Sequence, residues 1–326
     1  MSRIPTDAGL TEGSVRAGGQ PSGFMHDFTR YRKHGALCVM LFPVIVYFII
    51  FKYVPMAGIV MAFKDFKLGL GIWQSPWNGL ANFRQAFSTL SFTRAVQNTL
   101  AISLMKLAAG FPAPIILALL LNEVRHSAYK RVVQTISYLP HFISWVVMAG
   151  ILQQLLSPNN GAINYILTHG FGKAKSIYFL GDNNYFRGTL LVTDVWKNIG
   201  WGSILYLATI SGIDPALYEA AVCDGATRYQ RVRYITIPSL VPTITIMLIL
   251  SLGSVMDAGF DQVLNLYNAA VYKTGDIIDT YVYRYGIENT KYSLGAAVGL
   301  FKNVIGFTLV VGTNYITKKI NGNGIW

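Results

Sequence analysis

Six long apolar stretches separated by polar segments dominate the pattern of residues along this chain. The hydrocarbon core of a membrane, about 30 Å thick, requires roughly 20 apolar residues in one helical crossing, and each stretch meets or approaches that length. The stretches are residues 35–51, 96–121, 132–156, 189–210, 240–256 and 294–316. The pattern therefore predicts an all-α, polytopic membrane protein with about six transmembrane helices.

The composition agrees with a membrane protein. Of the 326 residues, 52% are hydrophobic and 13% are charged, and the mean hydropathy is +0.40. Such a chain is too apolar for an ordinary soluble domain. We expect a membrane domain over residues 35–317, preceded by a cytoplasmic tail over residues 1–34 that is disordered over residues 1–23 and forms a short basic helix at the membrane surface over residues 24–34. A disordered arm is the alternative for that tail, and residues 318–326 are expected to form a second cytoplasmic tail.

The distribution of basic residues predicts the orientation in the membrane. With a cytoplasmic N-terminus, the inside segments hold 13 Lys and Arg in 83 residues and the outside segments hold 11 in 113. Basic residues concentrate on the cytoplasmic side of membrane proteins, so both termini are expected to be cytoplasmic. The net charge of +12 is then a consequence of topology, and it does not indicate nucleic-acid binding.

The sequence carries no catalytic or metal-binding pattern. Its two cysteines, Cys38 and Cys223, fall in a predicted span and a predicted inside segment, and the five histidines are scattered without ligand spacing. The sequence contains no phosphate-binding loop, no metalloprotease helix and no nucleophile elbow. We therefore expect neither an enzyme, nor a metal site, nor a bound cofactor in this chain.

A polar island between the fourth and fifth stretches carries strong local signals. Asp214 and Pro215 are typical of a helix start, and the residues that follow are good helix formers. Gly225 should end this helix, because glycine tolerates the left-handed conformation found at helix ends. A second segment, residues 227–237, is predicted to lie against the membrane and to lead to Pro238 at the entrance of the next span. Composition alone also fits a plain connecting loop.

The order of residues in this island resembles the EAA motif of the permease subunits of type I ABC importers. The resemblance implies a MetI-like permease fold whose coupling loop, residues 211–239, contains a helix that docks on a cytoplasmic ATPase. The positions that match the motif are Glu219, Ala220, Ala221, Asp224, Gly225, Ala226, Arg231 and Pro238.

Further segments are similar to the LplB-type permeases of the carbohydrate-uptake group. They are residues 82–84, 111–114, 130–140, 194–197, 279–284 and 297–302. The resemblance implies import of an oligosaccharide, often one rich in uronic acids such as an aldouronate or alginate, across the bacterial inner membrane. It also implies a second homologous permease subunit, an external solute-binding protein and two ATPase subunits, which would bind the ATP and Mg²⁺.

Two polar groups are candidates for the substrate pathway, because charges within a span are costly and usually face a wet cavity. In the fourth stretch, Asp194 and Lys197 are predicted to pair. They belong to a candidate sugar-contacting group that consists of Asp194, Trp196, Lys197, Asn198 and Trp201. An anchor at the outer membrane interface is the equal alternative for that group.

The second candidate group consists of Asp257, Phe260, Asp261 and Gln262, at the outer end of the fifth stretch. We interpret Lys106, in the second stretch, as a helix-packing or snorkelling residue rather than a substrate ligand.

The expected mechanism is alternating access driven by the partner ATPase. An ion-coupled secondary transporter is the alternative, although inspection finds no inverted repeat with paired broken helices. A membrane scaffold that transports nothing is the third possibility.

Overall fold

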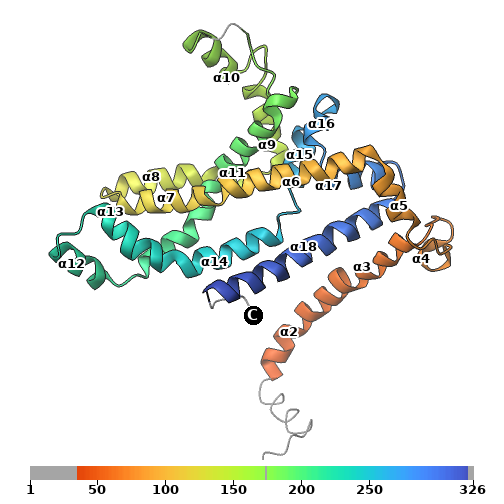
Figure 1. Cartoon of the computed structure of the whole chain (residues 1–326), viewed down its shortest axis with the longest axis horizontal. Helices are drawn as coiled ribbons and strands as arrows, with labels where there is room; N and C mark the ends of the chain where they lie inside the picture. Colours follow the sequence, from red (N-terminus) through yellow and green to blue (C-terminus); the bar gives the residue numbers. More distant parts are fainter. Residues whose placement is uncertain (1–34, 173–174, 322–326) are drawn as a thin grey trace, which may run out of the picture. The chain divides into compact units, whose positions relative to one another are not determined.

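A computed structural model describes residues 35–172 and 175–321 of the chain (Figure 1). Within these ranges the backbone forms helices joined by loops, and no strand occurs. This confirms the all-α prediction. The predicted N-terminal tail and its basic helix lie outside the described residues, as do the last five residues of the predicted C-terminal tail.

The chain separates into two compact units, residues 1–57 and residues 58–326. In the first unit, α2 (Gly35–Phe48) continues through a π-helical turn, Ile49–Tyr53, into α3 (Val54–Met56). Most large apolar side chains of this helix are exposed on its surface. The helix is rich enough in apolar residues to face lipid on all sides.

Four helical stretches are long and apolar enough to cross a membrane, among the residues that the structure describes. They are Val39–Phe63, Leu90–Glu123, Arg228–Gly253 and Tyr292–Tyr315. They correspond to the first, second, fifth and sixth predicted spans. The second of them contains α6 (Leu90–Gly110) and α7 (Pro112–Glu123), which meet at Phe111.

The prediction of one continuous helix over residues 132–156 is wrong. The α8 helix (Ser127–Tyr138) continues through a 3-10 turn, Leu139–Phe142, and α9 (Trp145–Leu155) then departs at an angle of 107°. The cause is local, because Ile143 and Ser144 adopt extended backbone conformations. The Ser144 hydroxyl then accepts a hydrogen bond from the Val147 N–H and starts a new helix. Counted as one bent span, this pair is a fifth candidate crossing.

The fourth predicted span is part of α11 (Asn183–Ser211), the central helix of the second unit. Its 29 residues correspond to about 43 Å, enough to cross a membrane. It is not among the four apolar stretches, because it carries charged residues that the protein interior surrounds. α11 contacts α6, α7, α8 and α14 (Ile237–Gly253), which in turn lies beside α18 (Tyr292–Asn321) (Figure 1).

Three apolar clusters hold the second unit together. The first joins α6, α9 and α11 to α15 (Phe260–Leu266). The second joins α5 (Ala81–Ser88), α6 and α18 to α17 (Ile278–Tyr281). The third joins α7, α11 and α14. The remaining short helices are α4 (Gly71–Gln74), α10 (Ala162–Tyr165), α12 (Pro215–Cys223), α13 (Arg228–Arg231) and α16 (Tyr272–Gly275).

Glycine allows α11 and α8 to approach closely. A Cβ atom on Gly200 would lie 2.1 Å from the main-chain oxygen of Ser137. Likewise, Gly295 of α18 lies against Gly286, whereas a Cβ atom on Gly299 would meet no atom within 4 Å. Gly295 and Gly299 are four residues apart in the last span. Within the described chain, Gly295 is in a close helix contact and Gly299 is not.

Candidate functional site

The predicted coupling loop, residues 211–239, contains the predicted short helix, α12. The Asp214 carboxylate accepts a hydrogen bond from the Ala216 N–H at 2.9 Å, and Pro215 occupies the first helical position. Gly225 follows the helix with φ of +78°, a conformation that favours glycine. The predicted start and end of this helix are both confirmed.

The second predicted surface segment is instead the beginning of a span. Thr227 and Gln230 form a capping box that starts α13. The chain then passes through a π-helical turn, Val232–Thr236, directly into α14. Pro238 consequently lies within a continuous helix and not at its entrance. Proline cannot donate the helical hydrogen bond, and the wide π-helical turn before it accommodates its ring.

The residues that match the motif lie on an open surface. Glu219, Ala220, Asp224 and Gly225 are exposed, while Ala221, Ala226 and Arg231 are half-buried. Two apolar side chains of α12, Leu217 and Val222, are also more than half exposed. The sequence pattern did not single them out, although large exposed apolar residues on a polar loop are a signal of a partner surface.

A hydrogen bond ties α12 to the span that follows it. The hydroxyl of Tyr218 lies 2.9 Å from that of Thr236, and Thr236 is buried. This contact joins the exposed helix to the base of α14 across a loop of polar residues. Tyr218 was not predicted as a site residue, because its partner is in another helix.

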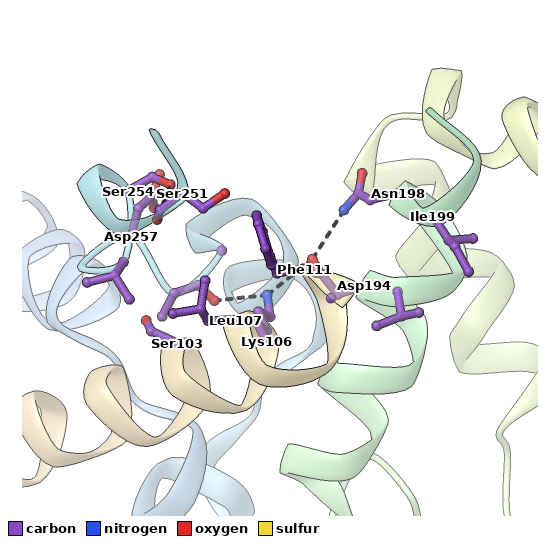
Figure 2. Close-up of a pocket in the computed structure, with 15 residues that line it drawn as sticks. Ser103, Lys106, Leu107, Phe111, Asp194, Asn198, Ile199, Ser251, Ser254 and Asp257 are labelled. Atoms are coloured by element: carbon purple, nitrogen blue, oxygen red, sulfur yellow. Dashed lines mark hydrogen bonds and ion pairs between the residues drawn. The ribbon is translucent and has the colours of Figure 1, made fainter. Parts of the chain in front are cut away.

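The first cavity lies within the helix bundle, between α6, α11, α14 and the loop that follows α14 (Figure 2). Its volume is about 380 Å³. Most of its polar lining consists of Ser103, Lys106, Asp194, Asn198, Ser251, Ser254 and Asp257. Three predicted pathway residues, Asp194, Asn198 and Asp257, are thus brought to one cavity.

The predicted pairing of Asp194 with Lys197 is wrong. Asp194 instead forms an ion pair with Lys106 at 3.3 Å, and its Oδ1 accepts a second hydrogen bond from Asn198 Nδ2 at 3.4 Å (Figure 2). Lys106 also donates to the main-chain oxygen of Ala258 at 3.0 Å and to Gln262 Oε1 at 2.5 Å. Lys106 therefore faces the bundle interior, which agrees with its interpretation as a helix-packing residue and excludes the snorkelling alternative.

Lys197 has a different environment from the one expected. Its ammonium donates to the main-chain oxygens of Pro140 at 3.1 Å, of His141 at 2.9 Å and of Ile143. It also lies 5.4 Å from the centre of the Trp145 ring. The three protons of the ammonium are thus directed at the backbone of the bend between α8 and α9. In this structure Lys197 stabilises the bend, and it borders neither cavity.

The two tryptophans of the first candidate group do not border the cavities described here. Trp196 is 45% exposed. Trp201 stacks on the His141 ring, with centroids 4.7 Å apart, and His141 Nδ1 lies 3.2 Å from Asn198 Oδ1. The structure therefore divides the predicted group, with Asp194 and Asn198 at the cavity and Lys197 and Trp201 beside the bend.

The second cavity, of about 580 Å³, contains three members of the other predicted group. Asp257, Phe260 and Asp261 all border it, whereas Gln262 instead contacts Lys106, and Asp257 and Gly259 border both cavities. The Lys302 ammonium lies 2.6 Å from each carboxylate oxygen of Asp279 on its wall. Burial raises the pKa of the Asp279 carboxyl, and the nearby Lys302 ammonium opposes that rise.

Metal binding finds no support in the geometry. Across residues 35–172 and 175–321, no three His, Cys, Asp or Glu side chains come close enough together to hold a metal ion.

Comparison with known proteins places this geometry in context. Residues 110–321 match the family described as binding-protein-dependent transport system inner membrane component. Protein LplB of Bacillus subtilis is 44% identical over 89% of this chain and 91% of its own length. The polygalacturonan/rhamnogalacturonan transport system permease protein YteP of the same organism is 42% identical, over 89% and 90%.

A solved structure has the same fold. It is a chain of a bacterial alginate ABC transporter in complex with an alginate pentasaccharide-bound periplasmic protein. It superimposes with a TM-score of 0.84 at 40% sequence identity, and it covers 91% of this chain and 99% of its own.

Proposed function

The chain belongs to the family of binding-protein-dependent transport system inner membrane components, and from this premise we propose that it is the permease subunit of an ATP-driven oligosaccharide importer. Members of this family are membrane components of transport systems and not enzymes. The four or five apolar spans among the described residues, together with α11, would provide the membrane part. The importer would carry the oligosaccharide into the cell, and both termini of the chain would lie in the cytoplasm.

The observation that carries the proposal is the exposed docking surface of α12. Glu219, Leu217 and Val222 present a carboxylate and two apolar side chains to solvent. A surface of mixed polar and apolar character is typical of a contact with another protein. We assign that partner as a cytoplasmic ATPase, which would supply the ATP and Mg²⁺ chemistry that this chain lacks.

The hydrogen bond between Tyr218 and Thr236 gives this surface a mechanical connection to the bundle. A force applied to α12 would reach α14 through this contact and through the continuous helix Arg228–Gly253. α14 borders the first cavity. ATP binding at the partner would thereby favour one arrangement of the cavity walls over the other.

The proposed cargo is an oligosaccharide that contains uronic acids. YteP is described as serving polygalacturonan and rhamnogalacturonan, and the solved transporter serves alginate. These polymers share carboxylate-bearing sugars. By analogy with the solved complex, an external solute-binding protein would deliver the sugar, and a second homologous permease would complete the pathway.

Two alternatives from the sequence, an ion-coupled transporter and a scaffold, find less support. Neither needs a docking helix, and neither agrees with the description of the family as a component of binding-protein-dependent transport systems. Purification of the chain with its partner permease and ATPase, followed by measurement of ATP hydrolysis, tests the proposal. We expect the loaded binding protein to stimulate hydrolysis several-fold. Unchanged hydrolysis with and without the loaded binding protein would contradict it.

A further inference from the structure

Two hydrogen-bond donors on one face of α6 border the first cavity. They are the Ser103 hydroxyl and the Lys106 ammonium, three residues apart and therefore neighbours on the helix surface. Ser103 is only 5% exposed, and its Oγ has no hydrogen-bond partner within the described part of the chain. Because buried hydroxyls are generally hydrogen-bonded, this one is available to a ligand in the cavity.

The Lys106 ammonium is held firmly on one side and loosely on the other. Gln262 Oε1 and the main-chain oxygen of Ala258 lie at 2.5 and 3.0 Å, while Asp194 Oδ1 lies at 3.3 Å. An ammonium has three protons, so these three acceptors account for its capacity. Asp194 is the most distant of the three and also accepts a hydrogen bond from Asn198. It is the acceptor that another carboxylate could most easily replace.

The ion pair in the second cavity differs in this respect. Both carboxylate oxygens of Asp279 accept hydrogen bonds from the Lys302 ammonium, each at 2.6 Å. Such bidentate, short contacts are the strong form of a charge-assisted hydrogen bond. A ligand would therefore displace Asp279 from Lys302 less easily than it would displace Asp194 from Lys106.

An acidic cargo needs a cationic partner in this cavity. Lys106 is the single cationic side chain among the residues that border the first cavity, and Asp194 and Asp257 border it as well. A uronate that entered without a cationic partner would meet two carboxylates, which is unfavourable. A uronate that binds Lys106 would gain a charge-assisted hydrogen bond that offsets part of this repulsion, while Asp194 retains its hydrogen bond from Asn198.

We propose that Lys106 and Ser103 form a carboxylate-binding subsite, in which the carboxylate of a uronic acid replaces Asp194 as the third acceptor of the Lys106 ammonium. The Ser103 hydroxyl would donate to the second carboxylate oxygen. This subsite rests on the proposed import of acidic oligosaccharides, and it names the group that distinguishes them from neutral ones.

The absence of a side chain at Gly259 leaves room for the Lys106 ammonium. Its φ is +87°, and a Cβ atom there would lie 2.4 Å from Lys106 Nζ. Any side chain at this position would displace the ammonium from Ala258 and Gln262. The loop between α14 and α15 thus has a glycine where the subsite requires one.

The test compares two ligands that differ only in the carboxylate. They are tetragalacturonate and the same tetrasaccharide with its carboxyl groups reduced to primary alcohols. Affinity for each is measured by calorimetry on the purified complex of both permeases and the ATPase, without the binding protein. We expect Lys106→Met to weaken tetragalacturonate about tenfold or more, since hydrogen bonds to charged groups are among the strong ones, and to change the reduced ligand less than about twofold.

Two further variants keep the test decisive if Lys106→Met folds poorly. Asp194→Asn removes the competing carboxylate and should tighten tetragalacturonate several-fold while it leaves the reduced ligand unchanged. Lys67→Met is the control, because the Lys67 side chain is exposed and borders neither cavity, and it should leave the ratio of the two affinities at the wild-type value. The subsite is refuted if Asp194→Asn fails to tighten the acidic ligand, if Lys67→Met alters the ratio as Lys106→Met does, or if the wild type binds neither ligand.

A second readout separates this outcome from failure of the proposed function. Stimulation of ATP hydrolysis by the loaded binding protein is measured on the same wild-type complex. If the wild type retains this stimulation but Lys106→Met leaves the ratio of the affinities for tetragalacturonate and the reduced ligand unchanged, the subsite alone is overturned. Absence of stimulation in the wild type would overturn the importer itself.

Discussion

The Lys197 ammonium donates to the main-chain oxygen of His141 at 2.9 Å, although 56 residues separate the two in sequence. Together with the Pro140 and Ile143 oxygens, this contact places a buried positive charge at the end of the 3-10 turn where the chain bends. Carbonyl groups at the end of a helix lack intrahelical partners, and a cation there satisfies them. A single side chain of α11 thus holds the bend between α8 and α9.

Replacement of Lys197 by methionine should destabilise the protein. The Pro140, His141 and Ile143 oxygens would lose their hydrogen bonds from Lys197, although the Pro140 oxygen keeps a second donor, the Ile143 N–H, so the cost should be about 2 kcal/mol or more. We expect the melting temperature of the purified complex to fall by about 5 °C or more. The measurement is thermal unfolding in detergent, with Lys67→Met as the control because the Lys67 side chain is exposed. Equal melting temperatures for the two variants would contradict the role of Lys197 at the bend.

The hydrogen bond between Tyr218 and Thr236 should contribute to coupling. Tyr218→Phe removes one hydroxyl, worth about 1 kcal/mol, at the connection from α12 to α14. We expect less sugar to be transported per ATP hydrolysed, by about two- to fivefold. Tyr229→Phe is the control, since Tyr229 lies nearby in α13 with 76% of its surface exposed. Identical transport per ATP in the two variants would remove this contact from the coupling route.

Substitutions at Gly225 should separate backbone conformation from side-chain size. Proline fixes φ near −65°, which is incompatible with the observed +78°, and it also lacks the N–H that donates to the Val222 oxygen at 3.0 Å. Gly225→Pro should therefore release or uncouple the ATPase. Gly225→Asn should retain most of the activity, because asparagine tolerates the left-handed conformation. Co-purification of the ATPase is the measurement, and full retention by the proline variant would contradict the docking role.

Glu219→Ala tests the same surface through its charge. The side chain is exposed, so its removal should not affect insertion or folding. We expect weaker binding of the ATPase and lower stimulated hydrolysis by the assembled complex. Wild-type values of both quantities would exclude Glu219 from the interface.

The close approach of α11 and α8 predicts unequal effects at two glycines. Gly200→Ala would place a Cβ atom 2.1 Å from the Ser137 oxygen and should cost about 1–3 kcal/mol as the helices move apart. Gly299→Ala would meet no atom within 4 Å, so it should be neutral or slightly stabilising in its helix. Thermal unfolding of both variants provides the comparison. Similar stability of the two would contradict the packing described here.

The features that were predictable from the sequence depend on local chemistry. The cap at Asp214, the proline at position 215 and the left-handed Gly225 specify α12 through residues within about three helical turns of one another. The apolar stretches likewise predict most of the spans by length alone. Long-range partners did not follow from such patterns.

The charged residues of the bundle illustrate this limit. Spacing on one helix favoured a pair between Asp194 and Lys197, yet their partners come from other helices. Lys106, 88 residues away, competes successfully for Asp194 because the packing of α6 on α11 brings the two together. Hydropathy also missed the bend at Ser144, since a capped bend within an apolar stretch leaves the average unchanged.

The central claim, import driven by ATP, is tested most directly by uptake into proteoliposomes. The complete complex is reconstituted, labelled tetragalacturonate is supplied with its binding protein on one side, and ATP is supplied on the side of the ATPase. We predict uptake that requires both ATP and the binding protein and that persists when ionophores collapse all ion gradients. Uptake driven by an ion gradient in the absence of ATP would contradict the account.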